Sequence, residues 1–164
     1  MNARRWFSDP VVAVALVVDA VLAVDAERLD RVEPRLAALA EFRRLPDFDA
    51  LAAANKRIAN ILRKSAVDPD APAGCPVAPE RFVEPAEIAL HRALEAATPV
   101  VEANLARLDF SAGLRSLATL RAPVDAFFDT VMVNSPDPLL KSNRLALLGG
   151  LALQMNRVAD LSRL

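Results

Sequence analysis

The chain has 164 residues and a formal net charge of −1, with hydrophobic residues at 54% but aromatic residues at only 5%. The apolar content is therefore mainly Ala, Leu and Val, which suits packed helices better than sheets. One Cys and one His are too few for a disulfide or a zinc site, and the four glycines form no phosphate-binding loop motif. We expect no metal or cofactor in this chain and a reducing, cytoplasmic compartment.

The first apolar run extends from Pro10 to Val18, after two arginines. Basic residues followed by an apolar run are also the pattern of a secretory signal. However, the run is nine residues long and lies between Asp9 and Asp19, which disfavours a signal or a membrane span. Because Asp9-Pro10 combines a capping carboxylate with proline at the first helical position, we expect a helix to begin here.

Two more helices are expected in the front part of the chain. One extends from about Asp30 to Arg44, and Pro46-Asp47 marks the start of the next. In the second of these helices the apolar residues gather on one side, and the opposite side carries four cations and an amide with no acid among them. This face consists of Lys56, Arg57, Asn60, Arg63 and Lys64.

The charge distribution supports a role for that face in binding phosphates. Residues 43 to 64 hold six bases, Arg43 and Arg44 included, and two acids, a net of +4 that leaves −5 for the rest of the chain. Cations concentrated on one face can bind RNA even when the net charge is not positive. The alternative is an ordinary solvated helix, since acids at its start and bases at its end are what the helix dipole favours.

Prolines recur every three or four residues between Ser65 and Glu84, which indicates a loop. This Pro-rich loop (65–84) separates a helical front part (10–64) from a helical back part (85–164). Each part is small for an independent core, so we expect one domain over residues 1–164.

In the back part, Glu84-Pro85, Ala122-Pro123 and Asp137-Pro138 mark helix starts, and the last helix is expected to reach about Arg163. An apolar stripe at helical spacing follows the first of these starts, from Leu90 to Leu108. The sequence therefore predicts an all-α fold, a single helical bundle of about six or seven helices.

No set of residues predicts a catalytic centre. His91 lies beside the apolar stripe and is expected to be structural. Asp125 and Asp129 are spaced as a carboxylate pair, but no His, Cys or second carboxylate cluster completes a catalytic set.

Several segments carry a resemblance to a known family. LPDFDALAAANKRIANILRK (Leu45–Lys64) resembles the helix of the anticodon-binding, DALR-type domain of the β subunit of bacterial glycyl-tRNA synthetase. PVDAFFDTVMV (Pro123–Val133), NRLALL (Asn143–Leu148) and VADLSRL (Val158–Leu164) are similar to the closing sequence of that family, in the same order. The ending VADLSRL argues against the related arginyl enzyme.

The resemblance implies that the chain binds the anticodon arm of tRNA(Gly) and takes part in the ATP-dependent charging of tRNA with glycine. Its implied partners are tRNA(Gly), the rest of the β subunit and the α subunit, without DNA or a membrane. ATP and Mg²⁺ would belong to the parent complex. Two alternatives stay open: a helical module that docks synthetase subunits, and the DALR-type domain of another synthetase such as the arginyl enzyme.

Overall fold

The computed structural model describes residues 10–24, 27–65 and 76–164, without the side chains of residues 10–13 and 29. Every regular element within these ranges is a helix, which confirms the all-α prediction. The seven α-helices are α1 (Pro10–Leu22), α2 (Val32–Phe42), α3 (Phe48–Lys64), α4 (Pro85–Ala106), α5 (Phe110–Leu117), α6 (Arg121–Thr130) and α7 (Pro138–Met155). Short 3-10 helices lie at Leu29–Arg31, Pro79–Arg81, Ala118–Leu120 and Leu161–Arg163 (η5).

The proline signals place three helix starts correctly. α1, α4 and α7 begin at Pro10, Pro85 and Pro138, as predicted. For α7 the capping carboxylate is in place, because Asp137 accepts hydrogen bonds from the backbone N–H groups of Leu139 and Leu140 at 2.9 and 3.3 Å. Asp9, the expected cap of α1, lies outside the described residues, as do positions 66–75 of the Pro-rich loop.

Two helix boundaries differ from the prediction, and one helix was not expected. The last helix ends at Met155 rather than near Arg163, because the chain turns after Met155 and packs against α1. The backbone N–H of Asp160 donates to the carbonyl of Ala20 in α1 at 2.8 Å. α6 begins at Arg121, ahead of Ala122-Pro123. The unexpected helix is α5, which Asp109 caps by accepting from the N–H of Ala112 at 2.9 Å.

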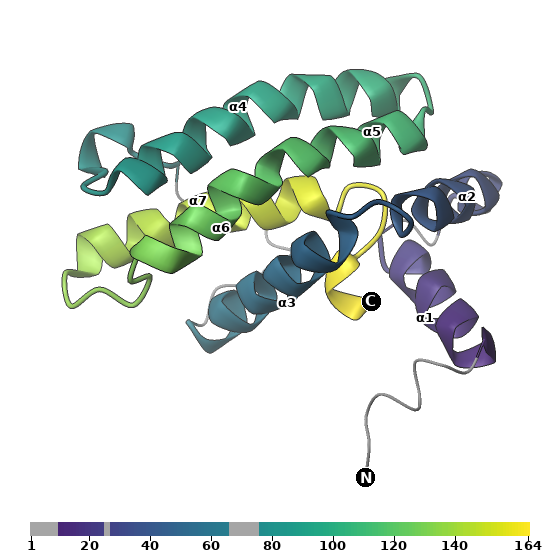
Figure 1. Cartoon of the computed structure of the whole chain (residues 1–164), viewed down its shortest axis with the longest axis horizontal. Coiled ribbons are helices and arrows are strands. Elements are labelled where there is room, and N and C mark those ends of the chain that lie inside the picture. Colours follow the sequence, from purple (N-terminus) through teal and green to yellow (C-terminus); the bar gives the residue numbers. More distant parts are fainter. Residues whose placement is uncertain (1–9, 25–26, 66–75) are drawn as a thin grey trace, which may run out of the picture.

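The helices form a bundle around a shared apolar core. In Figure 1, α4 lies along one side with α5 and α6 beside it, α7 and α3 lie on the other side, and α1 and α2 close one end. The C-terminal segment packs between α3 and α1. The largest fully buried side chains come from helices on both sides of the Pro-rich loop and include Phe42, Leu51, Ile58, Leu62, Leu90, Leu114, Phe127, Leu147 and Leu148.

None of the helices in the described ranges has the length and apolar content that crossing a membrane would need.

Candidate nucleic-acid interface

Helix α3 separates its residues by chemistry, as its sequence predicted. Its buried side includes Leu51, Ile58 and Leu62, each fully inaccessible to solvent. The opposite side exposes all five members of the predicted binding face. We call this set the basic face of α3: Lys56, Arg57, Asn60, Arg63 and Lys64.

Arg57 is held in position by an aromatic ring of a neighbouring helix. Its guanidinium carbon lies 4.1 Å from the ring centroid of Phe128 in α6. A cation over an aromatic face at this distance gains favourable electrostatic energy and loses conformational freedom. The side chain stays exposed. It therefore presents an oriented, planar charge at the edge of the basic face.

Asn60 and Arg63 interact with each other on the surface of α3. Nη2 of Arg63 donates to Oδ1 of Asn60 at 2.7 Å. Both side chains are exposed, and this bond stays within one helix. Because the bond from Arg63 fixes the side-chain carbonyl of Asn60, it also fixes the direction of the NH₂ group of the same amide. The two side chains form a paired polar unit in the middle of the basic face.

Arg43 and Arg44 lie at the other end of α3. Both are exposed, just after α2. The guanidinium of Arg43 lies 6.0 Å from the ring centroid of Phe48, the first residue of α3, whereas the basic face begins two turns further along the helix. The structure thus brings together the five residues of the basic face. Arg43 instead lines a separate hollow between α1 and α2.

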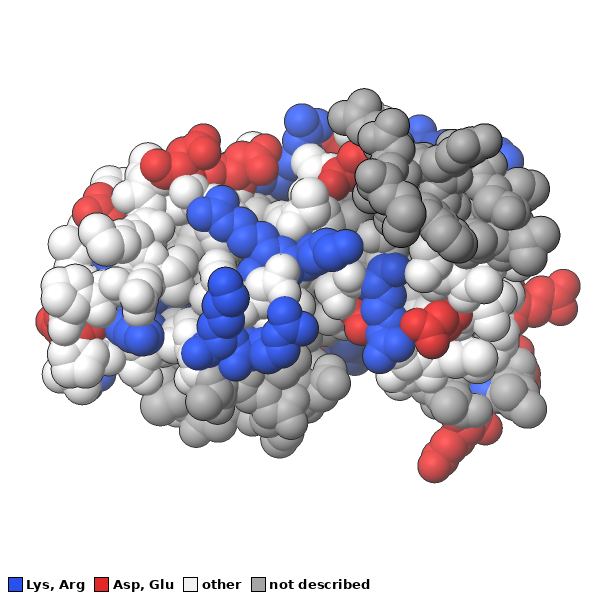
Figure 2. Space-filling model, turned by 90° about the horizontal axis from the view of Figure 1, so that it is seen from below, with Lys and Arg blue, Asp and Glu red and all other residues white. Residues whose placement is uncertain are grey.

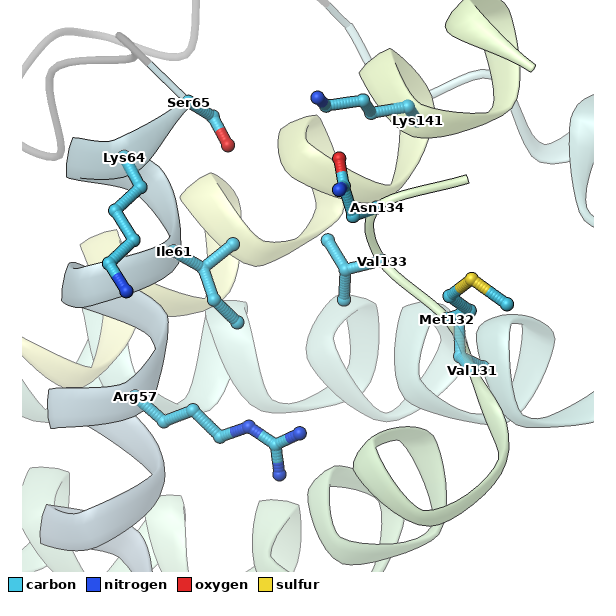
Figure 3. A pocket seen from close by; sticks show the side chains of 9 residues that line it. All are labelled: Arg57, Ile61, Lys64, Ser65, Val131, Met132, Val133, Asn134 and Lys141. Carbon is cyan, nitrogen blue, oxygen red and sulfur yellow. The ribbon is translucent and has the colours of Figure 1, made fainter. Parts of the chain in front are cut away.

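The basic face borders a pocket of about 500 Å³ between α3 and the segment that joins α6 to α7 (Figure 3). We call the first four residues of this segment, Val131–Asn134, the α6–α7 linker. The pocket is lined by Arg57, Ile61, Lys64 and Ser65 on one side, by the four linker residues on the other, and by Lys141 of α7. Lys141 adds a cation that sequence reasoning missed, because no pattern links it to a helix so distant in the chain.

Among the residues that the structure describes, no acidic side chain lines the pocket. Asp47, at the start of α3, accepts a hydrogen bond from Arg121 at 2.6 Å. That bond, together with the charge of Asp47, raises the pKa of the Arg121 guanidinium. Figure 2 views the side of the molecule on which α3 lies in Figure 1 and shows a group of Lys and Arg side chains with no acid among them.

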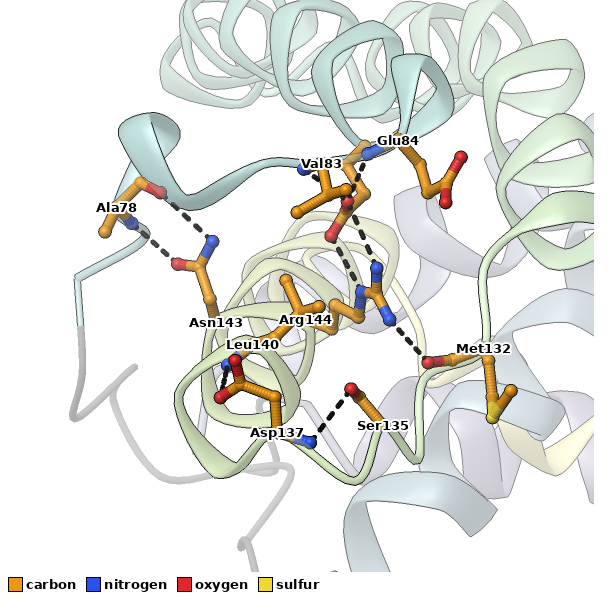
Figure 4. A network of polar contacts seen from close by, with 10 residues as sticks. Ala78, Val83, Glu84, Met132, Ser135, Asp137, Leu140, Asn143 and Arg144 are labelled. Carbon is orange, nitrogen blue, oxygen red and sulfur yellow. Dashed lines mark hydrogen bonds and ion pairs between the residues drawn. The ribbon is translucent and has the colours of Figure 1, made fainter.

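A buried ion pair holds the α6–α7 linker in place through a hydrogen bond to the linker backbone (Figure 4). Arg144 of α7 donates to Glu87 of α4 at 2.8 and 3.4 Å, and its Nη1 donates to the carbonyl of Met132 in the linker at 2.7 Å. Both charged side chains are almost fully buried. Burial alone would raise the pKa of Glu87, but hydrogen bonds from Arg144 and from the backbone N–H groups of Glu84 and Val83 outweigh it and lower the pKa. Glu87 is therefore a charged, structural carboxylate.

A second pair of bonds attaches the end of the Pro-rich loop to α7. The side chain of Asn143 accepts from the backbone N–H of Ala78 at 2.7 Å and donates to its carbonyl at 3.0 Å. Asn143 itself is buried. The end of the Pro-rich loop and the pocket wall are thus anchored at adjacent positions of α7, Asn143 and Arg144.

The residues considered for catalysis have structural surroundings. His91 packs against the ring of Phe82 with 5.3 Å between centroids and lies 3.5 Å from Glu95. Oδ2 of Asp125 lies 3.7 Å from Nε of Arg121, which is one turn earlier in the same helix. Neither group belongs to the pocket beside α3.

The comparison with known protein families decides what kind of domain this is. The model of the DALR anticodon binding domain matches residues 51–161. The chain belongs to this DALR family. The matched region contains the basic face of α3, the α6–α7 linker and Lys141, and it begins after Arg43 and Arg44.

Relatives of this DALR domain have names that agree with the resemblance found in the sequence. Proteins named glycine–tRNA ligase beta subunit are 52% identical in Thiobacillus denitrificans, 50% in Delftia acidovorans and 49% in a Janthinobacterium species, each over 147 residues. Each alignment covers 90% of this chain and 20% of the relative. The chain therefore spans about a fifth of the length of these relatives.

Proposed function

We propose that the chain binds the anticodon arm of tRNA(Gly) through the basic face of α3. The observation that carries the proposal is a set of four exposed cations, with no acid among them, on one face of a helix in a domain that belongs to the DALR anticodon-binding family. The names of relatives that are about 50% identical to the chain indicate that the amino acid carried by this tRNA is glycine rather than arginine.

The physical basis is electrostatic attraction to the RNA backbone. Lys and Arg side chains that neutralise phosphates release condensed counterions, which gives affinity that falls steeply with salt. Small side chains beside the cations, Ala53 and Ala59, leave room for the backbone to approach. Such contacts hold and orient the RNA, whereas contacts to base edges and stacking tell one anticodon from another.

The larger setting follows from the relatives. We propose that the chain acts as part of a glycyl-tRNA synthetase β subunit, together with the rest of that subunit and an α subunit. In this setting ATP and Mg²⁺ serve the charging reaction elsewhere in the complex, in the cytoplasm. The chain itself contributes the grip on tRNA and no reacting group.

Binding experiments with charge-matched variants test the proposal. The face variant Lys56→Ala/Arg63→Ala removes two cations that do not line the pocket. The control Arg92→Ala/Arg115→Ala removes two exposed arginines of α4 and α5, which lie away from α3 in Figure 1. The proposal predicts weaker binding of an RNA stem-loop carrying a glycine anticodon for the face variant and near wild-type binding for the control. Equal affinity of both variants would remove the basic face from the account.

A second candidate function, docking to other synthetase subunits, is favoured by a hollow between α1 and α2. It is lined by Val14, Val17, Val18, Leu36, Ala40 and Arg43, and Val14 is 63% exposed. Burying such an apolar surface against a partner is favourable. This role predicts that Val14→Asp weakens binding to purified synthetase subunits in the absence of RNA and leaves RNA binding unchanged. Unaltered subunit binding would exclude the hollow as the docking site.

A further inference from the structure

The pocket beside α3 combines an apolar interior with a cationic rim. Ile61, Met132 and Val133 supply apolar surface, and Arg57, Lys64 and Lys141 surround it. Asn134 adds an amide that can donate and accept hydrogen bonds. A site for inorganic phosphate alone would need no apolar surface. This composition suits a ligand with a flat, partly apolar body and negative charge at its edge.

The wall of this pocket is fixed before any ligand arrives. The carbonyl of Met132 is held by Arg144, which is itself fixed by Glu87 through hydrogen bonds within the protein. Val131, at the start of the wall, is buried in the core. A wall ordered on folding does not need to be ordered again on binding, so more of the contact energy appears as affinity.

Arg57 supplies a stacking surface at the pocket. Because Phe128 holds its guanidinium at 4.1 Å while the side chain stays exposed, the charged plane is oriented without being covered. Unpaired bases in RNA are commonly bound by stacking on arginine planes or aromatic rings. The ring of Phe128 beneath the guanidinium extends this stack into the protein.

We propose that the pocket binds one unpaired base of the anticodon loop. The base lies against Met132 and the plane of Arg57, Asn134 contacts its edge, and Lys64 and Lys141 hold the neighbouring phosphates. This inference rests on the proposed function and adds to it a base-binding subsite made by two segments far apart in the chain. The pocket thus adds contacts to a base to the electrostatic grip of the basic face.

The test pairs a missing base with a missing pocket contact. The RNA is a stem-loop with a glycine anticodon, together with a series in which each loop position in turn is abasic. At one position, loss of the base should weaken binding to the wild-type chain about tenfold or more, the range of a single stacked base. The pocket variant Met132→Ala/Asn134→Ala should bind the intact loop more weakly than the wild type does. It should lose less than the wild type when the base at that position is removed, because only the stack on Arg57 remains.

Two controls separate the pocket from the face and from the fold. Leu139→Ala/Ser142→Ala changes one apolar and one polar exposed residue of α7 outside the pocket and should behave as wild type. Lys56→Ala/Arg63→Ala should weaken binding of every loop but keep the loss at the abasic position. Circular dichroism checks that the pocket variant folds, which is expected because Met132 and Asn134 are exposed. If it unfolds, Lys141→Ala replaces it, with affinity for the intact loop again expected to fall.

Each way of failing has its own signature. If wild type binds the loops and depends on Lys56 and Arg63, but the pocket variant loses the same factor for every loop or for none, the base subsite is wrong and the proposed function stands. If an acidic peptide loses binding to the pocket variant while the RNA series is unaffected, the pocket serves a protein ligand instead. If wild type binds none of the loops, the proposed function fails as well.

Discussion

Gly149 of α7 and Gly113 of α5 lie within helices but in different surroundings. A methyl group built at Gly149 meets no atom within 4 Å, whereas one at Gly113 lies 3.2 Å from Cδ2 of Leu105 in α4. The neighbouring Gly150 would have an ordinary contact of 3.5 Å with Leu94. Gly113 therefore lets α4 and α5 approach closely, but Gly149 has no such packing role in the described structure.

Gly149→Ala is expected to raise the free energy of unfolding by about 1 kcal/mol, the difference in helix propensity between the two residues. Gly113→Ala is the matched control. There the gain in propensity is opposed by the tight contact with Leu105, so its stability should rise less or fall. Chemical denaturation of both variants measures the difference. A loss of stability for Gly149→Ala would show that this position has a packing role.

Asn60 is the residue of the basic face best suited to reading a base edge, because its amide offers both a donor and an acceptor. We predict that Asn60→Ala weakens binding of the cognate glycine anticodon more than that of a scrambled one, by about 1 to 3 kcal/mol if the contact is bidentate. Titrations with both RNAs measure this difference. An equal loss for the two RNAs would leave Asn60 only a supporting role toward Arg63.

At the scale of elements, the ion pair between Glu87 and Arg144 connects α4, α7 and the α6–α7 linker. A buried pair of this kind is no strong source of net stability, since desolvation opposes the attraction. Removing one member is different, because the other charge is left buried without its partner. Glu87→Gln should therefore lower the free energy of unfolding by about 3 to 5 kcal/mol at neutral pH. The same change should weaken RNA binding by loosening the linker.

The pH dependence of that loss follows from the lowered pKa of Glu87. A carboxyl group whose pKa is lower in the folded state stabilises the protein fully above its ordinary pKa of 4.5 and loses this contribution as pH falls through the folded-state pKa. The deficit of Glu87→Gln relative to wild type should thus be constant above about pH 6 and shrink below about pH 4. Denaturation at several pH values tests this. A deficit that grew toward acid pH would contradict the assignment.

Local signals in the sequence predicted some elements and failed for others. Pro85 and Pro138 mark real helix starts, and the basic face is exposed as its helical spacing indicated. Local sequence signals did not predict where α7 ends. Oδ1 of Asn156 accepts from Asn55 at 2.6 Å and from Leu161 N–H at 3.2 Å, contacts that stabilise a turn instead of further helix.

Part of the candidate site could likewise be predicted from the sequence, and part could not. One wall of the pocket comes from α3, whose pattern is visible in the sequence, and the other depends on tertiary packing. Lys141 and Asn134 carry no periodic or motif signal, and their approach to Lys64 depends on how α7 packs against α3. Arg144 also looks like a surface residue in the sequence, yet it is 5% exposed because Glu87 neutralises it.

At the scale of the whole molecule, the domain combines a net charge of −1 with a local concentration of cations. The excess of acid elsewhere should repel RNA from the other surfaces and favour one orientation of approach. The ion pairs of Arg121 with Asp47 and of Arg163 with Asp19 and Asp160 neutralise cations outside the basic face. Binding should therefore depend on few phosphate contacts, most of them on α3 and Lys141.

The salt dependence of RNA binding tests this central claim most directly. The affinity of the chain for the glycine anticodon stem-loop is measured over a range of salt concentrations, for wild type and for Lys56→Ala/Arg63→Ala. Two lost phosphate contacts should reduce the magnitude of the slope of log affinity against log salt by about 1.4 for an unpaired strand. The control Arg92→Ala/Arg115→Ala should keep the wild-type slope. A face variant with the wild-type slope would contradict the claim that α3 grips the RNA backbone.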